Sequence, residues 1–177
     1  MQVYQPYVAQ PMMTPTDVIG FVDGLVFGLI QKEDLPEIQT CLQHAPEIAD
    51  QLTQAISDLE KKDFADIIKA IGEFGAIIQE LPQDLSDCEA MQGDIKRIEN
   101  WAQIFTHPTE LIATLTKNVI SNWGGITTDI NKVTTDFSSS DFKGAGEDIA
   151  DVLVLSLGPV PQGKWWSKST IVRSLKI

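Results

Sequence analysis

Residues that carry catalytic chemistry are scarce in this chain. Its 177 residues include only two histidines and two cysteines, and no Gly-Lys-Ser/Thr sequence follows any glycine. A phosphate-binding loop needs such a lysine, and nucleophilic catalysis needs a nucleophile, a base and a group that orients the base. The sequence therefore predicts a protein that is not an enzyme and does not bind nucleotides.

The sequence also lacks the usual patterns of metal ligands. Zinc ligands of structural sites come in closely spaced pairs, and calcium loops combine alternating Asp or Asn with a glycine and a final glutamate. The stretch DINKVTTDFSSSD misses that glycine and that glutamate. Glu147 and Asp151 stand one helical turn apart, which is more typical of a solvated acidic face. Four residues could bind zinc, but they do not have the closely spaced pairs of structural zinc sites: Cys41, His44, Cys88 and His107. We predict no metal and no cofactor.

Long apolar runs are missing too. No basic segment followed by an apolar one opens the chain, and no Asn-x-Ser/Thr sequon occurs. The apolar pattern from Thr16 to Ile30 contains Asp17 and Asp23 and is shorter than the ~20 residues that span a membrane. No transmembrane segment is predicted. The absence of an export signal favours an intracellular site, cytoplasmic or ciliary, over secretion or a cell-surface site after processing.

Positive charge is sparse and unevenly placed. The formal net charge is −12, and all 25 acidic residues lie at or before Asp151. Nine basic residues accompany them, so residues 1–151 carry −16, whereas the rest of the chain carries +4. A body this acidic repels phosphate backbones, and no nucleic-acid partner is predicted.

Apolar residues recur at spacings of three and four through most of the chain, and no alternating run appears before residue 160. This pattern predicts an all-α fold, a compact bundle of about six or seven helices joined by short turns. The expected helices are 16–30, capped by Thr16 and Asp17; 34–59, kinked or restarted at Pro46; 63–82, ended by Pro82; 91–105; 111–123, closed by Gly124 and Gly125; 126–137; and 142–157.

The two ends of the chain differ from this body. Residues 1–15 form an expected extended N-terminal arm, residues 16–158 the helical domain, and residues 159–177 a basic, aromatic C-terminal arm. Exposed aromatic residues beside cations are typical of interface anchors. The residues predicted to bind a partner are Tyr4, Tyr7, Met12, Met13, Lys164, Trp165, Trp166, Lys168, Ile171, Arg173, Leu175 and Ile177.

Three glycines are spaced four residues apart in the first expected helix, at Gly20, Gly24 and Gly28. Small residues at this spacing make a flat strip that another helix backbone can approach closely. We predict a helix-packing strip in the core of the domain; contact with a helix of a partner is the alternative.

Two parts of the chain have a similar pattern, as in an internal repeat. The pairs Asp63-Phe64 and Asp141-Phe142 lie 78 residues apart, and apolar residues before them match at the same offset. Both segments describe a helix, a polar turn and a second helix. Duplication of one hairpin and two independent hairpins both explain this pattern.

Cys41 and Cys88 have two interpretations. In an oxidising compartment they form a bridge that closes a long loop, and in the cytosol they are small buried hydrophobic residues. The segments FVDGLVFGL, DLPEIQTC, KKDFADIIKAIGEFGAIIQELPQDLSDC and DIKRIENWAQIF, within about residues 18–157, resemble small helical two-cysteine proteins of ciliates. This resemblance implies a helical domain with a Cys41 to Cys88 disulfide.

These observations predict a non-catalytic structural or interaction protein. We expect a helical subunit whose arms hold it in a larger assembly, either a filament or lattice of its own copies or a ciliary, cytoskeletal or organellar complex. Its partners are then proteins. The alternative is a binding module for a small apolar ligand or lipid within the bundle.

Overall fold

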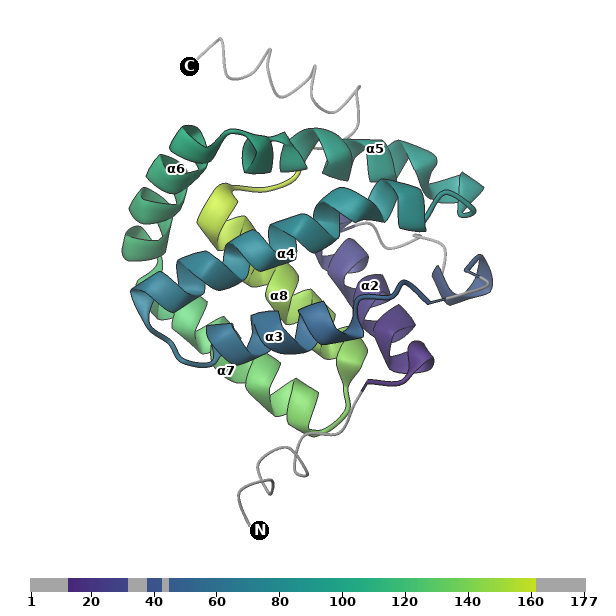
Figure 1. Ribbon diagram of the computed structural model, residues 1–177, viewed down its shortest axis with the longest axis horizontal. Helices are drawn as coiled ribbons and strands as arrows, with labels where there is room; N and C mark the ends of the chain where they lie inside the picture. The colour runs from purple at the N-terminus through teal and green to yellow at the C-terminus, as the bar shows by residue number, and fades with distance from the viewer. Residues whose placement is uncertain (1–12, 32–37, 43–44, 162–177) are drawn as a thin grey trace.

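The computed structural model describes residues 13–31, 38–42 and 45–161 (Figure 1). These residues form seven α-helices and no strand, so the predicted all-α class is confirmed. The α-helices are α2 (Pro15–Ile30), α3 (Ala49–Leu59), α4 (Phe64–Asp84), α5 (Gln92–Trp101), α6 (Pro108–Ser121), α7 (Trp123–Ser138) and α8 (Phe142–Leu157). Short 3-10 segments are η2 (Ile38–Thr40), η3 (Glu89–Met91) and η4 (Ala102–Thr106).

Helix α2 begins one residue earlier than the sequence indicates, and its N-cap lies two residues earlier. Thr14, not Thr16, is the N-cap: its hydroxyl accepts a hydrogen bond from the Asp17 backbone N–H at 3.1 Å. The Asp17 carboxylate in turn accepts from the Thr14 N–H at 2.9 Å, which completes a capping box. Pro15 occupies the first helical position, where its missing N–H costs nothing.

Two predictions based on proline have different outcomes. At Pro46 the expected restart is confirmed, because α3 begins after it, at Ala49, whereas the described residues between Asp34 and Pro46 form only the 3-10 turn η2 and no α-helix. Residues 32–37, where the predicted start fell, lie outside the described part of the chain. The prediction at Pro82 is wrong: α4 continues to Asp84, although the proline has no N–H to donate to the carbonyl four residues before it.

The predicted helix end at Gly124 and Gly125 is also wrong. Helix α6 ends at Ser121, and both glycines lie in the first turn of α7. The break falls at Asn122, whose side-chain amide donates to the Leu155 carbonyl of α8 at 3.0 Å. The end of α6 therefore coincides with a tertiary contact to α8 and not with a glycine.

Helices α2 and α8 lie side by side through the middle of the fold, and the other helices surround them (Figure 1). Apolar residues cover most of α2, and ten of its residues are buried. Phe21 of α2 stacks on Phe74 of α4, with 6.5 Å between ring centroids. None of the described helices has the length and apolar character needed to cross a membrane.

The helical hairpins α3–α4 and α7–α8 have the same turn. Lys62 and Ser140, 78 residues apart, are both left-handed, with φ of 55° and 64°. Asp63 and Asp141 follow as the N-cap residues of α4 and α8. The offset seen in the apolar pattern therefore extends to the backbone of the turn.

The chain stays attached to the body for three residues beyond Gly158. Trp101 donates its indole N–H to the Gly158 carbonyl at 2.9 Å, and the Arg97 Nε donates to the Pro161 carbonyl at 2.7 Å. Between them Val160 is 3% exposed. Residues 159–161, placed by the sequence in the C-terminal arm, therefore pack on the body beside α5.

Candidate functional site

The glycine strip of α2 lies against α8. A Cβ placed on Gly24 would overlap the carbonyl oxygen of Lys143 and stand 2.8 Å from its carbonyl carbon. At Gly28 the added Cβ would lie 2.5 Å from the Ala150 Cβ. Gly20 is different, because the nearest atom to its added Cβ is the Phe142 Cβ at 3.9 Å. Only Gly24 and Gly28 therefore require the absence of a side chain.

Helix α8 contributes a glycine of its own that sequence reasoning missed. A Cβ on Gly146 would overlap the Phe21 carbonyl oxygen and lie 2.7 Å from the Leu25 backbone nitrogen. Gly144 and Gly146 at the start of an apolar helix were the available signal. The backbones of α2 and α8 thus touch from both sides.

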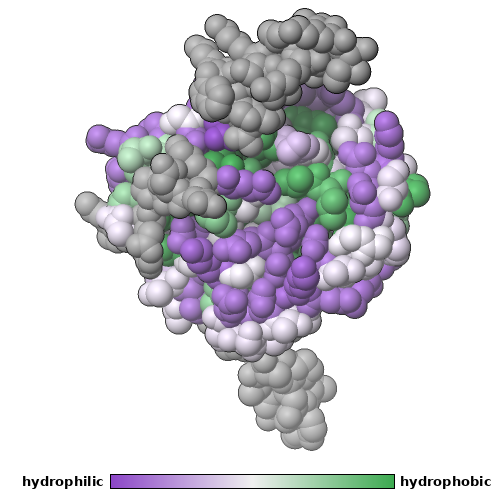
Figure 2. Space-filling model, turned by 180° about the vertical axis from the view of Figure 1, so that it is seen from behind, coloured by the Kyte–Doolittle hydropathy of each residue, from purple (hydrophilic) through white to green (hydrophobic). Residues whose placement is uncertain are grey.

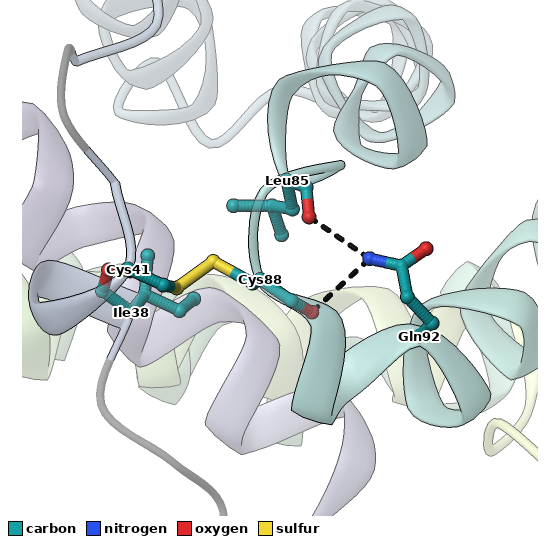
Figure 3. Close-up of a disulfide and its surroundings, with 5 residues drawn as sticks. All are labelled: Ile38, Cys41, Leu85, Cys88 and Gln92. Atoms are coloured by element: carbon teal, nitrogen blue, oxygen red, sulfur yellow. Dashed lines mark hydrogen bonds between the residues drawn. A yellow bond between two sulfur atoms is a disulfide. The ribbon is translucent and has the colours of Figure 1, made fainter.

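Cys41 and Cys88 form a disulfide, with 5.2 Å between their Cα atoms (Figure 3). It joins the residue after η2 to the one before η3, and Cys88 is 2% exposed. Gln92 braces the same turn, because its side-chain amide donates to the carbonyls of Leu85 and Cys88 at 3.0 and 3.1 Å. The bridge joins the end of the short η2 turn to the turn between α4 and η3.

A buried pair of carboxyl groups joins α3 to α4. Asp58 is fully buried, and its carboxylate contacts the Lys61 and Lys69 ammonium groups at 3.4 and 3.7 Å. A hydrogen bond from Glu73 lowers the pKa of Asp58 despite its burial. Burial, and then Asp58, raise the pKa of Glu73. Of the two groups, Asp58 therefore favours its charged form and Glu73 favours its protonated form.

A second pair joins α7 to α8. Burial raises the pKa of Asp148 to about 7, together with the hydrogen bond and the negative charge of Asp136. Burial also raises the pKa of Asp129, Glu147 and Asp151. In the described part of the chain no group of His, Cys, Asp and Glu has the arrangement of a metal site.

Three large apolar side chains are exposed at α6 and at the start of α7. The exposed fractions are 52% for Ile112, 63% for Ile120 and 37% for Trp123. We call these three residues the α6 patch. The half-buried Leu155 lies beside it, within 3.2 Å of a Cβ built on Gly125. Figure 2 shows hydrophobic side chains gathered in the upper half of the rear face, above a mostly hydrophilic lower half.

The surface of the described residues includes two open depressions, one at α3 and α4 and one at α7. The larger, about 540 Å³, is lined by Ala45, Pro46, Glu47, Gln51, Glu80 and Asp84. The smaller, about 420 Å³, is lined by Thr128, Asn131, Lys132, Thr135 and Asp136. Mostly polar side chains line both, so neither resembles the apolar cavity that a lipid occupies.

The partner-binding residues predicted from the sequence fall almost entirely outside the described residues. Met13 is the exception, and there the prediction is wrong: its side chain is 7% exposed and belongs to the core. It directly precedes the Thr14 cap, which brings it against the body. The other eleven are Tyr4, Tyr7, Met12, Lys164, Trp165, Trp166, Lys168, Ile171, Arg173, Leu175 and Ile177.

One protein family matches this chain. It is described as SctB-like, secreted protein B-like, and the match spans residues 4–156. Because that range covers most of the chain, the protein belongs to the SctB-like family. Comparison with curated proteins and with solved structures gives no match. The match does not test the resemblance to ciliate proteins, which stays a prediction.

Proposed function

We propose that this SctB-like protein is a secreted, non-enzymatic structural protein that assembles by docking its C-terminal segment on a neighbouring copy. The family description names a secreted protein. The Cys41 to Cys88 disulfide supports the same compartment, because disulfides persist in oxidising environments and are rare in the cytosol. This proposal replaces the intracellular site that the sequence favoured.

The α6 patch is the observation that carries the assembly proposal. Large apolar side chains that cluster on a surface mark interaction sites, whereas scattered ones need no explanation. Ile120 and Trp123 stand three residues apart at the junction of α6 and α7. Leu155 of α8 reaches the same junction, because its carbonyl accepts from the Asn122 side chain and its side chain lies next to Gly125. The patch offers a second molecule an apolar contact without a change in the fold.

The C-terminal segment has the chemistry to occupy that patch. Residues 162–177 begin just after Pro161, which Arg97 holds against α5. Sixteen residues reach at most about 55 Å when extended, enough to arrive at a neighbouring copy. Trp165 and Trp166 supply aromatic anchors, and the four basic residues complement the acidic body. Salt screens that attraction, so the apolar anchors must provide the persistent part of the affinity.

The experiment removes residues 162–177 and compares molar mass by light scattering at low and high salt. Residues 160 and 161 are kept because Val160 belongs to the core. We expect the full chain to form larger species and the shortened chain to be monomeric. Ile120→Ser with Trp123→Ser should cause the same loss while the helical circular dichroism stays unchanged.

The matched control is Thr128→Ser, an exposed polar position on α7, which should assemble normally. Undiminished assembly of the shortened chain would contradict the proposal. The alternative, a binder of a small apolar ligand, has no specific observation in its favour.

A further inference from the structure

Each helical hairpin carries one carboxyl pair where its two helices face each other. The pairs are Asp58 of α3 with Glu73 of α4, and Asp136 of α7 with Asp148 of α8. Asp58 and Asp136 each lie four residues before the left-handed turn residue of their hairpin. The first member of each pair thus has the same place in its hairpin. The second members differ, because Glu73 lies 11 residues after Lys62 and Asp148 lies eight residues after Ser140.

Each pair contains one buried oxygen that no donor satisfies. These atoms are Oε1 of Glu73 and Oδ2 of Asp148, and no N–H or O–H of the described residues reaches them. A buried carboxylate oxygen without a donor is costly. A carboxyl partner becomes a donor only when one group of the pair carries a proton. The geometry of both pairs therefore suits the protonated state.

The surrounding charges make the two pairs unequal. Asp58 of α3, Lys61 of the turn after α3 and Lys69 of α4 act on Glu73, so two cations offset the negative charge there. Asp136 and Lys132 of α7 and Asp151 of α8 act on Asp148.

In the second hairpin Lys132 is the one cation that acts on Asp148, and it lies 3.9 Å from Asp129. The groups that act on each pair come from its own hairpin, and none comes from α2, α5 or α6. The α7–α8 pair is therefore the more sensitive to pH.

We propose that the two carboxyl pairs form a pH-dependent lock on the hairpins. In acid one proton joins each pair and closes the contact between the two helices. As the pH rises that proton is lost, two negative charges face each other, and the contact loosens; for Asp148 the pKa that sets this loss is about 7. The lock does not depend on the proposed assembly, because none of its four carboxyl residues belongs to the α6 patch.

The direction of the effect follows from the raised pKa values. A carboxyl group whose pKa is higher in the folded state binds its proton more tightly there, so lowering the pH favours folding. For Asp148 the gain builds up as the pH falls from about 7 towards the ordinary Asp value of 3.8. Asp58 acts in the opposite direction, because its lowered pKa removes stability only at pH values below 3.8.

The test measures urea denaturation of the full chain between pH 5 and pH 8.5. We expect the midpoint to fall as the pH rises through 7. Asp148→Asn keeps the shape of the side chain and supplies an N–H donor to Asp136 at every pH. It should flatten that fall and raise the folding equilibrium constant at pH 8 on the order of tenfold. Glu73→Gln should act in the same direction with a smaller effect.

Asp87→Asn is the matched control, because Asp87 is exposed and lies outside the helices. This variant should follow the unmodified chain at every pH. An Asp148→Asn variant that loses stability with rising pH as steeply as the unmodified chain would overturn the proposal. If that variant does not fold, carbon-13 NMR of the unmodified protein decides. An Asp148 carboxyl that titrates near 7 supports the lock, and one that titrates near 4 refutes it.

Discussion

Gly24 of α2 and Lys143 of α8 are in backbone contact, with no room between them for even a methyl group. Gly146 repeats the arrangement from the other helix, against Phe21 and Leu25. No layer of side chains therefore separates the two central helices at this crossing. Their packing depends on backbone atoms, which cannot move aside as a flexible side chain can.

Gly24→Ala should lower the free energy of unfolding by about 1–3 kcal/mol, because the new methyl group overlaps a backbone carbonyl. Gly20→Ala is the matched control in the same helix, since its nearest neighbour leaves ordinary contact distance. The control should change stability little or raise it by up to about 1 kcal/mol through better helix propensity. Urea denaturation measures both variants, and equal effects would show that the close contact is absent.

Thr14→Ala should cost about 1 kcal/mol, because it removes the hydroxyl that caps α2. Thr16→Ala, two residues later on the same exposed turn, should change the unfolding free energy far less. Thermal denaturation of the two variants shows which threonine caps the helix. A larger loss of stability in Thr16→Ala than in Thr14→Ala would show that Thr16 is the N-cap, as the sequence predicts.

The sequence was informative about helices and weak about their ends. Periodic apolar spacing depends on local geometry, so it predicted the all-α class and the stretches of α2 and α4 that are buried. The end of α6 depends on a contact between Asn122 and α8, which lies 33 residues away. No local pattern encodes such a contact. Glycines at 124 and 125 therefore gave the wrong boundary.

The carboxyl pairs could not be predicted from the sequence for a related reason. Acidic residues are abundant, and their pattern is typical of a solvated face. Whether Asp58 meets Glu73 depends on how α3 packs on α4, and only the folded hairpin brings them together. For Met13 the sequence predicted contact with a partner, because the residue stands in an uncharged, proline-rich segment, but its side chain packs into the core.

Removal of the Cys41 to Cys88 bridge should lower stability by about 4 kcal/mol, since the bridge closes a loop of 47 residues' separation. The double variant Cys41→Ser with Cys88→Ser tests this by urea denaturation. Reductant should destabilise the unmodified chain and leave the double variant unaffected. Intact mass with and without reductant reports the bridge in the native protein. Two free thiols in that material would contradict both the bridge and the proposed secretion.

Variants at two tryptophans distinguish effects on stability from effects on assembly. Trp101→Phe keeps an aromatic ring against Phe105 but removes the indole N–H that donates to Gly158. We expect a loss of about 0.5–1.5 kcal/mol in the free energy of unfolding, with molar mass in solution unchanged.

Trp123→Ser should do the opposite, because the 37% exposed side chain belongs to the α6 patch and not to the core. The assembled fraction should fall, and the unfolding free energy should fall only by the contribution of the part of the ring that the fold covers. Denaturation and light scattering on the same two samples measure both quantities. If Trp123→Ser lowers stability and leaves assembly intact, its ring supports the fold and the docking surface lies elsewhere.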